Sequence, residues 1–176
     1  MQHRTVDQVP PPSPRVIDVV RATCATLPDD STLLAEHFYD HLFRLAPDIR
    51  PMFAADMTQQ QIRMSEALLD VVRNLDQPQE IQAYLRDLGA HHYRVLGVEP
   101  AQYRYVGWAL VRAVGDLSNS WSSHTGSAWV LVYEWITANM LAGAQEAAER
   151  SRMTETRRTE PARERQTDPG RRARTR

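Results

Sequence analysis

Apolar residues recur at steps of three and four positions along most of this 176-residue chain. The clearest stretch contains Leu34, Phe38, Leu42 and Leu45. This spacing places side chains on one face of an α-helix, whereas a half-buried strand would alternate apolar and polar residues. Glycine, which supplies turns in β-sheet proteins, occurs only seven times. We therefore predict an all-α fold.

The same periodicity divides the chain into six substantial helices and one short turn. The helices are expected at residues 16–27, 34–45, 57–75, 81–96, 100–121 and 126–148. Pro47 and Pro51 bracket the short turn, and proline favours a 3₁₀ turn over a continuing helix.

Both ends of the chain lack apolar periodicity. Residues 1–14 include four prolines, and residues 149–176 consist largely of Arg, Thr and Glu. Segments this poor in apolar side chains bury too little surface to offset the entropy of ordering. The sequence therefore predicts a disordered Pro-rich leader over 1–14, one folded domain over 15–148 and a disordered Arg-rich tail over 149–176.

Charge and cysteine content exclude several classes of function. The formal net charge is −1 and Cys24 is the only cysteine. An intrachain disulfide and a cysteine-based zinc site are therefore excluded, and no nucleic-acid partner is expected. The polar N-terminus carries no signal core and no apolar run approaches transmembrane length. We expect a cytoplasmic protein with no membrane partner.

His92 is the histidine with the strongest chemical signal. It shares one face of its predicted helix with Leu85, Leu88 and Leu96. An imidazole on an apolar face can be a buried ligand for iron, or a core histidine bonded to a backbone carbonyl, and the residues alone leave both open. The neighbouring His91 points about 100° away around the helix and is expected to be partly exposed.

His37 and His41 form a second histidine pair, spaced i, i+4 on one helix face. The sequence shows no third metal ligand, and the pair does not belong to a His-Glu-x-x-His motif. We interpret this face as solvated.

Four segments, in order, resemble the globin domains of flavohaemoglobins and of their single-domain bacterial relatives. Residues 37–43 (HFYDHLF) and 46–53 (APDIRPMF) resemble the second helix and the following corner. Residues 88–92 (LGAHH) and 97–103 (GVEPAQY), with Val106 and Gly107, resemble the proximal-histidine region, and Trp129 and Tyr133 fit the last helix. The resemblance covers residues 15–148. It implies a globin fold of six to seven helices packed around a haem pocket.

The resemblance also implies a role for individual residues. His92 would be the proximal iron ligand, and Tyr39 and Gln60 would be distal hydrogen-bond donors to O₂. The remaining contacts with haem would come from Phe53, Met64, Leu88 and Tyr103. The cofactor would be haem b, because the chain has no Cys-x-x-Cys-His motif for covalent attachment.

Three positions depart from the family pattern. The turn after His92 is one residue longer than usual, which leaves His91 as an alternative ligand. The corner before Gln60 is short, which leaves Gln59 and Gln61 as alternatives to it. Ala144 stands where the family often has a glutamate that supports the proximal histidine, so a weaker electron push to iron is expected.

The resemblance implies a haem protein that binds O₂, NO and CO reversibly. Its chemistry would be nitric oxide detoxification, as a nitric oxide dioxygenase supplied with electrons by an external reductase, because the sequence after residue 148 does not resemble a reductase domain. Oxygen storage, oxygen transport and haem-based gas sensing remain alternatives, because all need the same pocket. The protein would be a monomer or a homodimer.

Overall fold

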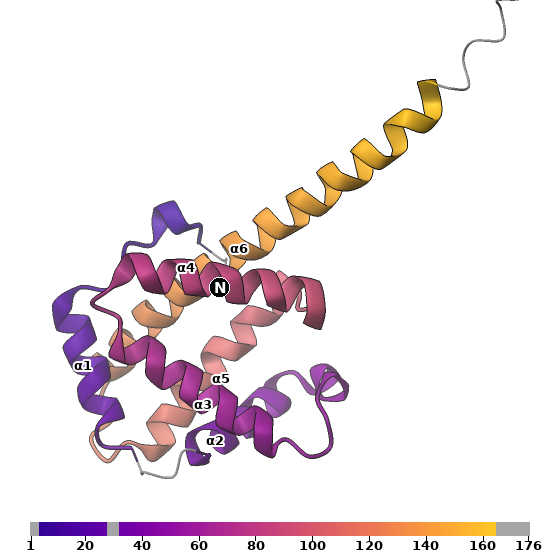
Figure 1. The fold of residues 1–176 in the computed structure, drawn as a ribbon. Helices are drawn as coiled ribbons and strands as arrows, with labels where there is room; N and C mark the ends of the chain where they lie inside the picture. The colour runs from indigo at the N-terminus through magenta and orange to yellow at the C-terminus, as the bar shows by residue number, and fades with distance from the viewer. Residues whose placement is uncertain (1–3, 28–31, 165–176) are drawn as a thin grey trace, which may run out of the picture.

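A computed structural model describes residues 4–27 and 32–164 of the chain, and these residues form helices and no strands (Figure 1). The prediction of an all-α fold is therefore confirmed. The α-helices are α1 (Pro14–Cys24), α2 (Leu33–Leu45), α3 (Thr58–Arg73), α4 (Pro78–His91), α5 (Tyr103–Leu117) and α6 (Ser123–Glu164). Short 3₁₀ helices are η1 (Val6–Gln8), η2 (Pro47–Met52) and η4 (Pro100–Gln102), and η3 (His92–Leu96) is a π-helix.

The first half of α6 lies in the centre of the fold, and α1, α4 and α5 pack against it. Trp129, Val132 and Trp135 of α6 are almost completely buried. On the other side of the molecule α2 packs along α5. Burial of each apolar stripe against a neighbouring stripe is what stabilises helices of this length, since they are marginal in isolation.

Helices α4 and α6 cross with their backbones in contact. A Cβ atom on Gly89 of α4 would overlap the backbone of Met140, and one on Gly143 of α6 would overlap the backbone of Arg86. Only glycine leaves room for two backbones at this distance. The pair of glycines therefore fixes the depth at which α4 sits on α6.

The end of α4 differs from the continuous helix expected over residues 81–96. The α-helix stops at His91, and residues 92–96 form a single π turn. The carbonyl of His92 accepts from the N–H groups of Gly97 and Val98, and Gly97 has a φ of 64°. A π turn holds one residue more than an α turn, so it accommodates the additional residue noted in the sequence. Glycine adopts the left-handed conformation that ends the turn without strain.

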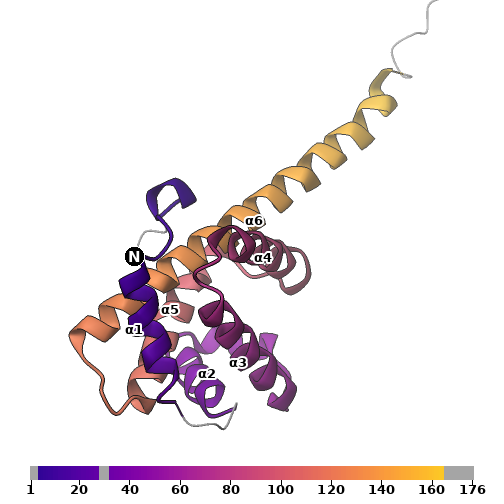
Figure 2. The same cartoon turned by 60° about the vertical axis from the view of Figure 1, so that its left-hand side comes forward.

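The described residues near both ends of the chain include a buried side chain before α1 and a helix after the body. Val9, in the segment before α1, is only 5% exposed, and Arg4 Nη1 lies 3.2 Å from Glu134 Oε2 of α6. At the other end α6 continues to Glu164 and projects beyond the body (Figures 1 and 2). One ion pair spaced by a helical turn, Arg150 with Glu146 at 3.9 Å, lies at the start of this projection. Residues 1–3 and 165–176 of the two predicted segments lie outside the described residues.

None of the helices in the described part of the chain combines the length and the apolar character needed to span a bilayer.

A substitution tests the crossing of α4 and α6. We expect Gly89→Ala to lower the free energy of unfolding by roughly 2–3 kcal/mol, because the added methyl group must push two backbones apart. Gly126→Ala in α6 is the matched control, since its Cβ would meet only the exposed Trp121 side chain, 3.3 Å away. Urea denaturation of both variants measures the effect. Equal stability of the two would contradict a backbone contact at Gly89.

The two ends of the chain should contribute differently to stability. Removing residues 153–176 should leave the thermal midpoint nearly unchanged, because the described residues from Glu149 to Arg158 are exposed. Val9→Ala should cost about 1–2 kcal/mol, since it uncovers a buried apolar contact. Calorimetry on the two proteins checks both expectations. A large loss on truncation would show that the extension of α6 supports the body.

Candidate functional site

Three aromatic rings from α2 and from the end of η2 form one wall of the site. Tyr39 is buried, and its ring lies 5.8 Å from that of Phe43 and 5.5 Å from that of Phe53, between centroids. The rings of Phe43 and Phe53 are 5.3 Å apart in an edge-to-face arrangement, the geometry that aromatic pairs prefer. Arg50 lies over the outer side of Phe43. Phe53 is thus fixed by its neighbours and remains only half-buried.

Gln60 of α3 connects to this wall through Tyr39. Its Nε2 donates to the Tyr39 hydroxyl at 3.0 Å, and its Oε1 accepts from Nη2 of Arg63 at 3.1 Å. Gln59 is exposed and Gln61 is half-buried. Of the three consecutive glutamines, Gln60 is therefore the one that contacts Tyr39.

The Tyr39 hydroxyl stays protonated at neutral pH. Burial raises its pKa, and the hydrogen bond from Gln60 and the charge of Arg63 offset only part of that rise. A neutral phenol that already accepts a bond from an amide still has its own proton to donate. The chemistry available at this wall is hydrogen-bond donation from a buried, uncharged group.

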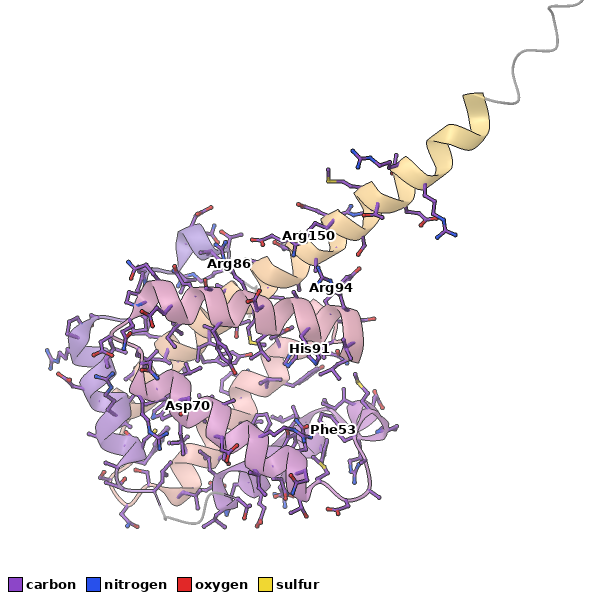
Figure 3. The ribbon with its side chains drawn as sticks, viewed as in Figure 1. Phe53, Asp70, Arg86, His91, Arg94 and Arg150 are labelled. Atoms are coloured by element: carbon purple, nitrogen blue, oxygen red, sulfur yellow. The ribbon has the colours of Figure 1, made fainter. Side chains whose placement is uncertain are left out.

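His92 begins the π turn after α4 and is half-buried. Burial, together with the nearby charge of His91, lowers its pKa. The neutral imidazole therefore dominates at pH 7 and has a free electron pair on one ring nitrogen. His91 is exposed. Figure 3 shows His91 at the end of α4, on the same side of the molecule as Phe53.

Tyr103, the first residue of α5, lies beside His92, with 6.4 Å between ring centroids. It is 4% exposed, burial raises its pKa to about 12, and its hydroxyl has no hydrogen-bond partner among the described residues. Its backbone carbonyl accepts from the hydroxyl of Tyr133, which lies against Gly107. Tyr103 is therefore held by its backbone, and its phenol oxygen is left as an unpaired buried polar atom.

Met64 of α3 and Leu88 of α4 are both half-buried beside the core. Sequence reasoning did not assign a role to Phe43 or Arg63. Arg63 follows Gln60 by three positions on a helix. Because this spacing brings side chains together, it could have indicated that Arg63 contacts Gln60.

The histidine pair on α2 has a partner that the sequence did not indicate. Asp116 Oδ2 of α5 lies 2.6 Å from His41 Nε2 and 3.4 Å from His37 Nδ1. The face remains partly open to solvent, with the side chain of His37 36% exposed, and α5 also brings a carboxylate to it. The hydrogen bond from His41 lowers the pKa of Asp116. Within the described chain no group of three His, Cys, Asp or Glu side chains has the geometry to hold a metal, so the cluster joins α2 to α5.

The residues of the site fit a haem by their chemistry. A neutral imidazole is the ligand type that haem iron takes from a protein, and apolar side chains suit the porphyrin faces. Phe53, Met64 and Leu88 are large and apolar, yet each stays half-buried beside the core. The unpaired Tyr103 hydroxyl and the Tyr39 hydroxyl are the polar groups of the set.

Comparisons with known proteins show which family the chain belongs to. Among curated proteins, the flavohemoprotein of Rhizobium meliloti is 31% identical over 139 residues, which are 76% of this chain and 34% of that protein. The flavohemoprotein of Bacillus subtilis is 24% identical over 68% of this chain and 31% of its own length. The chain thus spans about a third of the length of these relatives.

Solved structures show the same fold. A bacterial globin from Campylobacter jejuni superposes with a TM-score of 0.67 at 21% identity, covering 78% of this chain and 99% of that one. A Pseudomonas aeruginosa protein described as structurally highly homologous to human hemoglobin gives a TM-score of 0.61 at 25% identity, covering 73% and 98%. The family model described as Globin matches residues 36–140, more than half of the sequence. The chain belongs to the globin family.

Proposed function

We propose that this chain holds one haem b through His92 and binds O₂ reversibly next to Tyr39 and Gln60. The observation that carries the proposal is the hydrogen bond from Gln60 Nε2 to the Tyr39 hydroxyl, which leaves the phenol proton free beside an apolar wall. The half-buried neutral His92 supplies the iron ligand. Cys24 is the only cysteine, which favours non-covalent attachment.

When bound, the haem supplies an iron with one coordination position for a diatomic gas. The other functions belong to the protein. His92 donates an electron pair, and Phe53, Met64 and Leu88 exclude water from the porphyrin. Tyr39 donates a hydrogen bond to a ligand that gains negative charge when it is O₂. Such a bond to a charged acceptor contributes about 1.5–3 kcal/mol, whereas CO gains little charge and little stabilisation.

We propose nitric oxide dioxygenation as the reaction that uses this site. One NO, one O₂ and one electron give one nitrate ion, and the electron comes from an external reductase. A buried donor slows the release of O₂, which suits a reaction that must keep O₂ until NO arrives. The names of the flavohemoprotein relatives support a haem in the same fold.

Haem attachment can be tested by comparing two neighbouring histidines. His92→Ala should abolish the absorption bands of a five-coordinate histidine-ligated haem, because it removes the proposed ligand. His91→Ala should keep them, since His91 is exposed. Spectra of the ferric, ferrous and ferrous–CO proteins measure this, and acid–butanone should extract the haem. Loss of the bands in His91→Ala alone would assign the ligand to His91.

The hydroxyl of Tyr39 should govern O₂ release. Tyr39→Phe keeps the ring contacts with Phe43 and Phe53 and removes only the donor, so the O₂ dissociation rate should rise by roughly tenfold to a hundredfold. CO rebinding should change much less. Stopped-flow measurements of O₂ release and flash photolysis of the CO protein compare the two ligands.

Phe43→Leu is the control for packing, because it alters the same wall without removing a donor. The nitrate formed per NO consumed, measured with a chemical reductant, tests the reaction itself. Equal O₂ release from the wild type and Tyr39→Phe would remove Tyr39 from the site. Rapid O₂ release with no nitrate formed would instead leave oxygen storage as the function.

A further inference from the structure

Arg63 is an exposed residue of α3, one helical turn beyond Gln60, and its guanidinium contacts the amide of that glutamine. We propose that Arg63 is a positioning residue that sets the direction of the hydrogen bond between Gln60 and Tyr39. The inference rests on the proposed function, because it concerns how the Tyr39 hydroxyl is kept available for a ligand. The hydrogen bond that Arg63 makes in the described structure is to Gln60 and not to Tyr39.

The side-chain amide of a glutamine has nearly the same shape in two orientations. An amide can face a hydroxyl with its oxygen or with its nitrogen, and only the surrounding hydrogen bonds distinguish the two orientations. Guanidinium groups donate and never accept. Because Nη2 of Arg63 lies 3.1 Å from Oε1 of Gln60, the oxygen of the amide is taken by Arg63 and the NH₂ group faces Tyr39.

The orientation of the amide decides what Tyr39 does with its proton. An NH₂ group can only donate, so the Tyr39 oxygen accepts and its own O–H is free to point elsewhere. With the amide reversed, Oε1 would accept that O–H and withdraw the proton from a ligand. Arg63 therefore makes the reversed orientation unfavourable, because reversal would place the NH₂ group against a cation.

Arg63 has an alternative partner that it does not use. Glu66 stands three positions further along α3, at a spacing that allows an ion pair, yet no ion pair joins Arg63 to a carboxylate in the described part of the chain. Its charge also reaches Tyr39, where it lowers the pKa against the effect of burial. A cation held near a phenol in this way strengthens the phenol as a donor.

The test compares Arg63→Met with two matched variants in the haem-loaded protein. Arg63→Lys keeps a cationic donor, and Arg73→Met removes another exposed arginine of α3 that pairs with Asp70 instead. The first readout is the CO stretching frequency of the ferrous–CO protein, which responds to donors at the ligand. The second is the O₂ dissociation rate.

Arg63→Met should shift or split the CO stretching band and raise the O₂ dissociation rate by roughly threefold to tenfold, the range for one neutral hydrogen bond. Arg63→Lys should stay closer to the wild type, and Arg73→Met should match it. Because Arg63 acts through the Tyr39 hydroxyl, its effect should vanish when Arg63→Met is combined with Tyr39→Phe.

Three results would overturn the inference. An effect of Arg63→Met that persists in the Tyr39→Phe background would mean that the cation acts on the ligand directly. Faster haem loss with an unchanged CO band would mean that Arg63 holds the haem carboxylates. No change in either readout would mean that Gln60 orients itself. Failure of the proposed function is distinct, because either the wild-type protein would show no haem spectrum, or Tyr39→Phe alone would leave the O₂ dissociation rate unchanged.

Discussion

Two helices cross at a point where neither carries a side chain, and the site depends on that crossing. Gly89 of α4 lies against the backbone of Met140, and Gly143 of α6 lies against the backbone of Arg86. Backbone contact of this kind cannot be adjusted by changing a rotamer, so the position of α4 on the buried part of α6 is fixed. His92 follows Gly89 by three residues, and the crossing therefore determines where its imidazole can lie.

The π turn at residues 92–96 continues this constraint into the site. The crossing fixes the start of the turn, and Tyr103, the first residue of α5, follows after η4. The segment between α4 and α5 contains one residue more than an α turn can hold. A π turn that ends at Gly97, which has a positive φ, accommodates this residue without disturbing either helix. The extra residue is absorbed after His92, which keeps His92 in register with the apolar face of α4.

The wall of the candidate site that contains Tyr39 is built from polar groups that are hydrogen-bonded to one another. Burial keeps the Tyr39 phenol neutral, Gln60 bonds to its oxygen, and Arg63 takes the far end of the amide. Each group alone is ordinary: a core tyrosine, a helix glutamine, a surface arginine. Together they form a chain of donors that ends in one free hydroxyl proton, which is the feature that a pocket for a ligand with partial negative charge needs.

The sequence by itself determined the helices and the apolar faces, because spacings such as Leu34, Phe38 and Leu42 are set by the 3.6-residue turn and need no partner to be read. It also indicated His92, Tyr39 and Gln60 as candidates, through their order along the chain. Only the tertiary structure decided which of three glutamines contacts Tyr39, that Asp116 meets His41, and that Val9 is buried. The first two contacts join residues that are 21 and 75 positions apart in the sequence. The burial of Val9 depends on neighbouring parts of the fold. The part of α6 beyond Ala148 lies outside the periodic pattern, because it lacks the buried face on which periodicity depends.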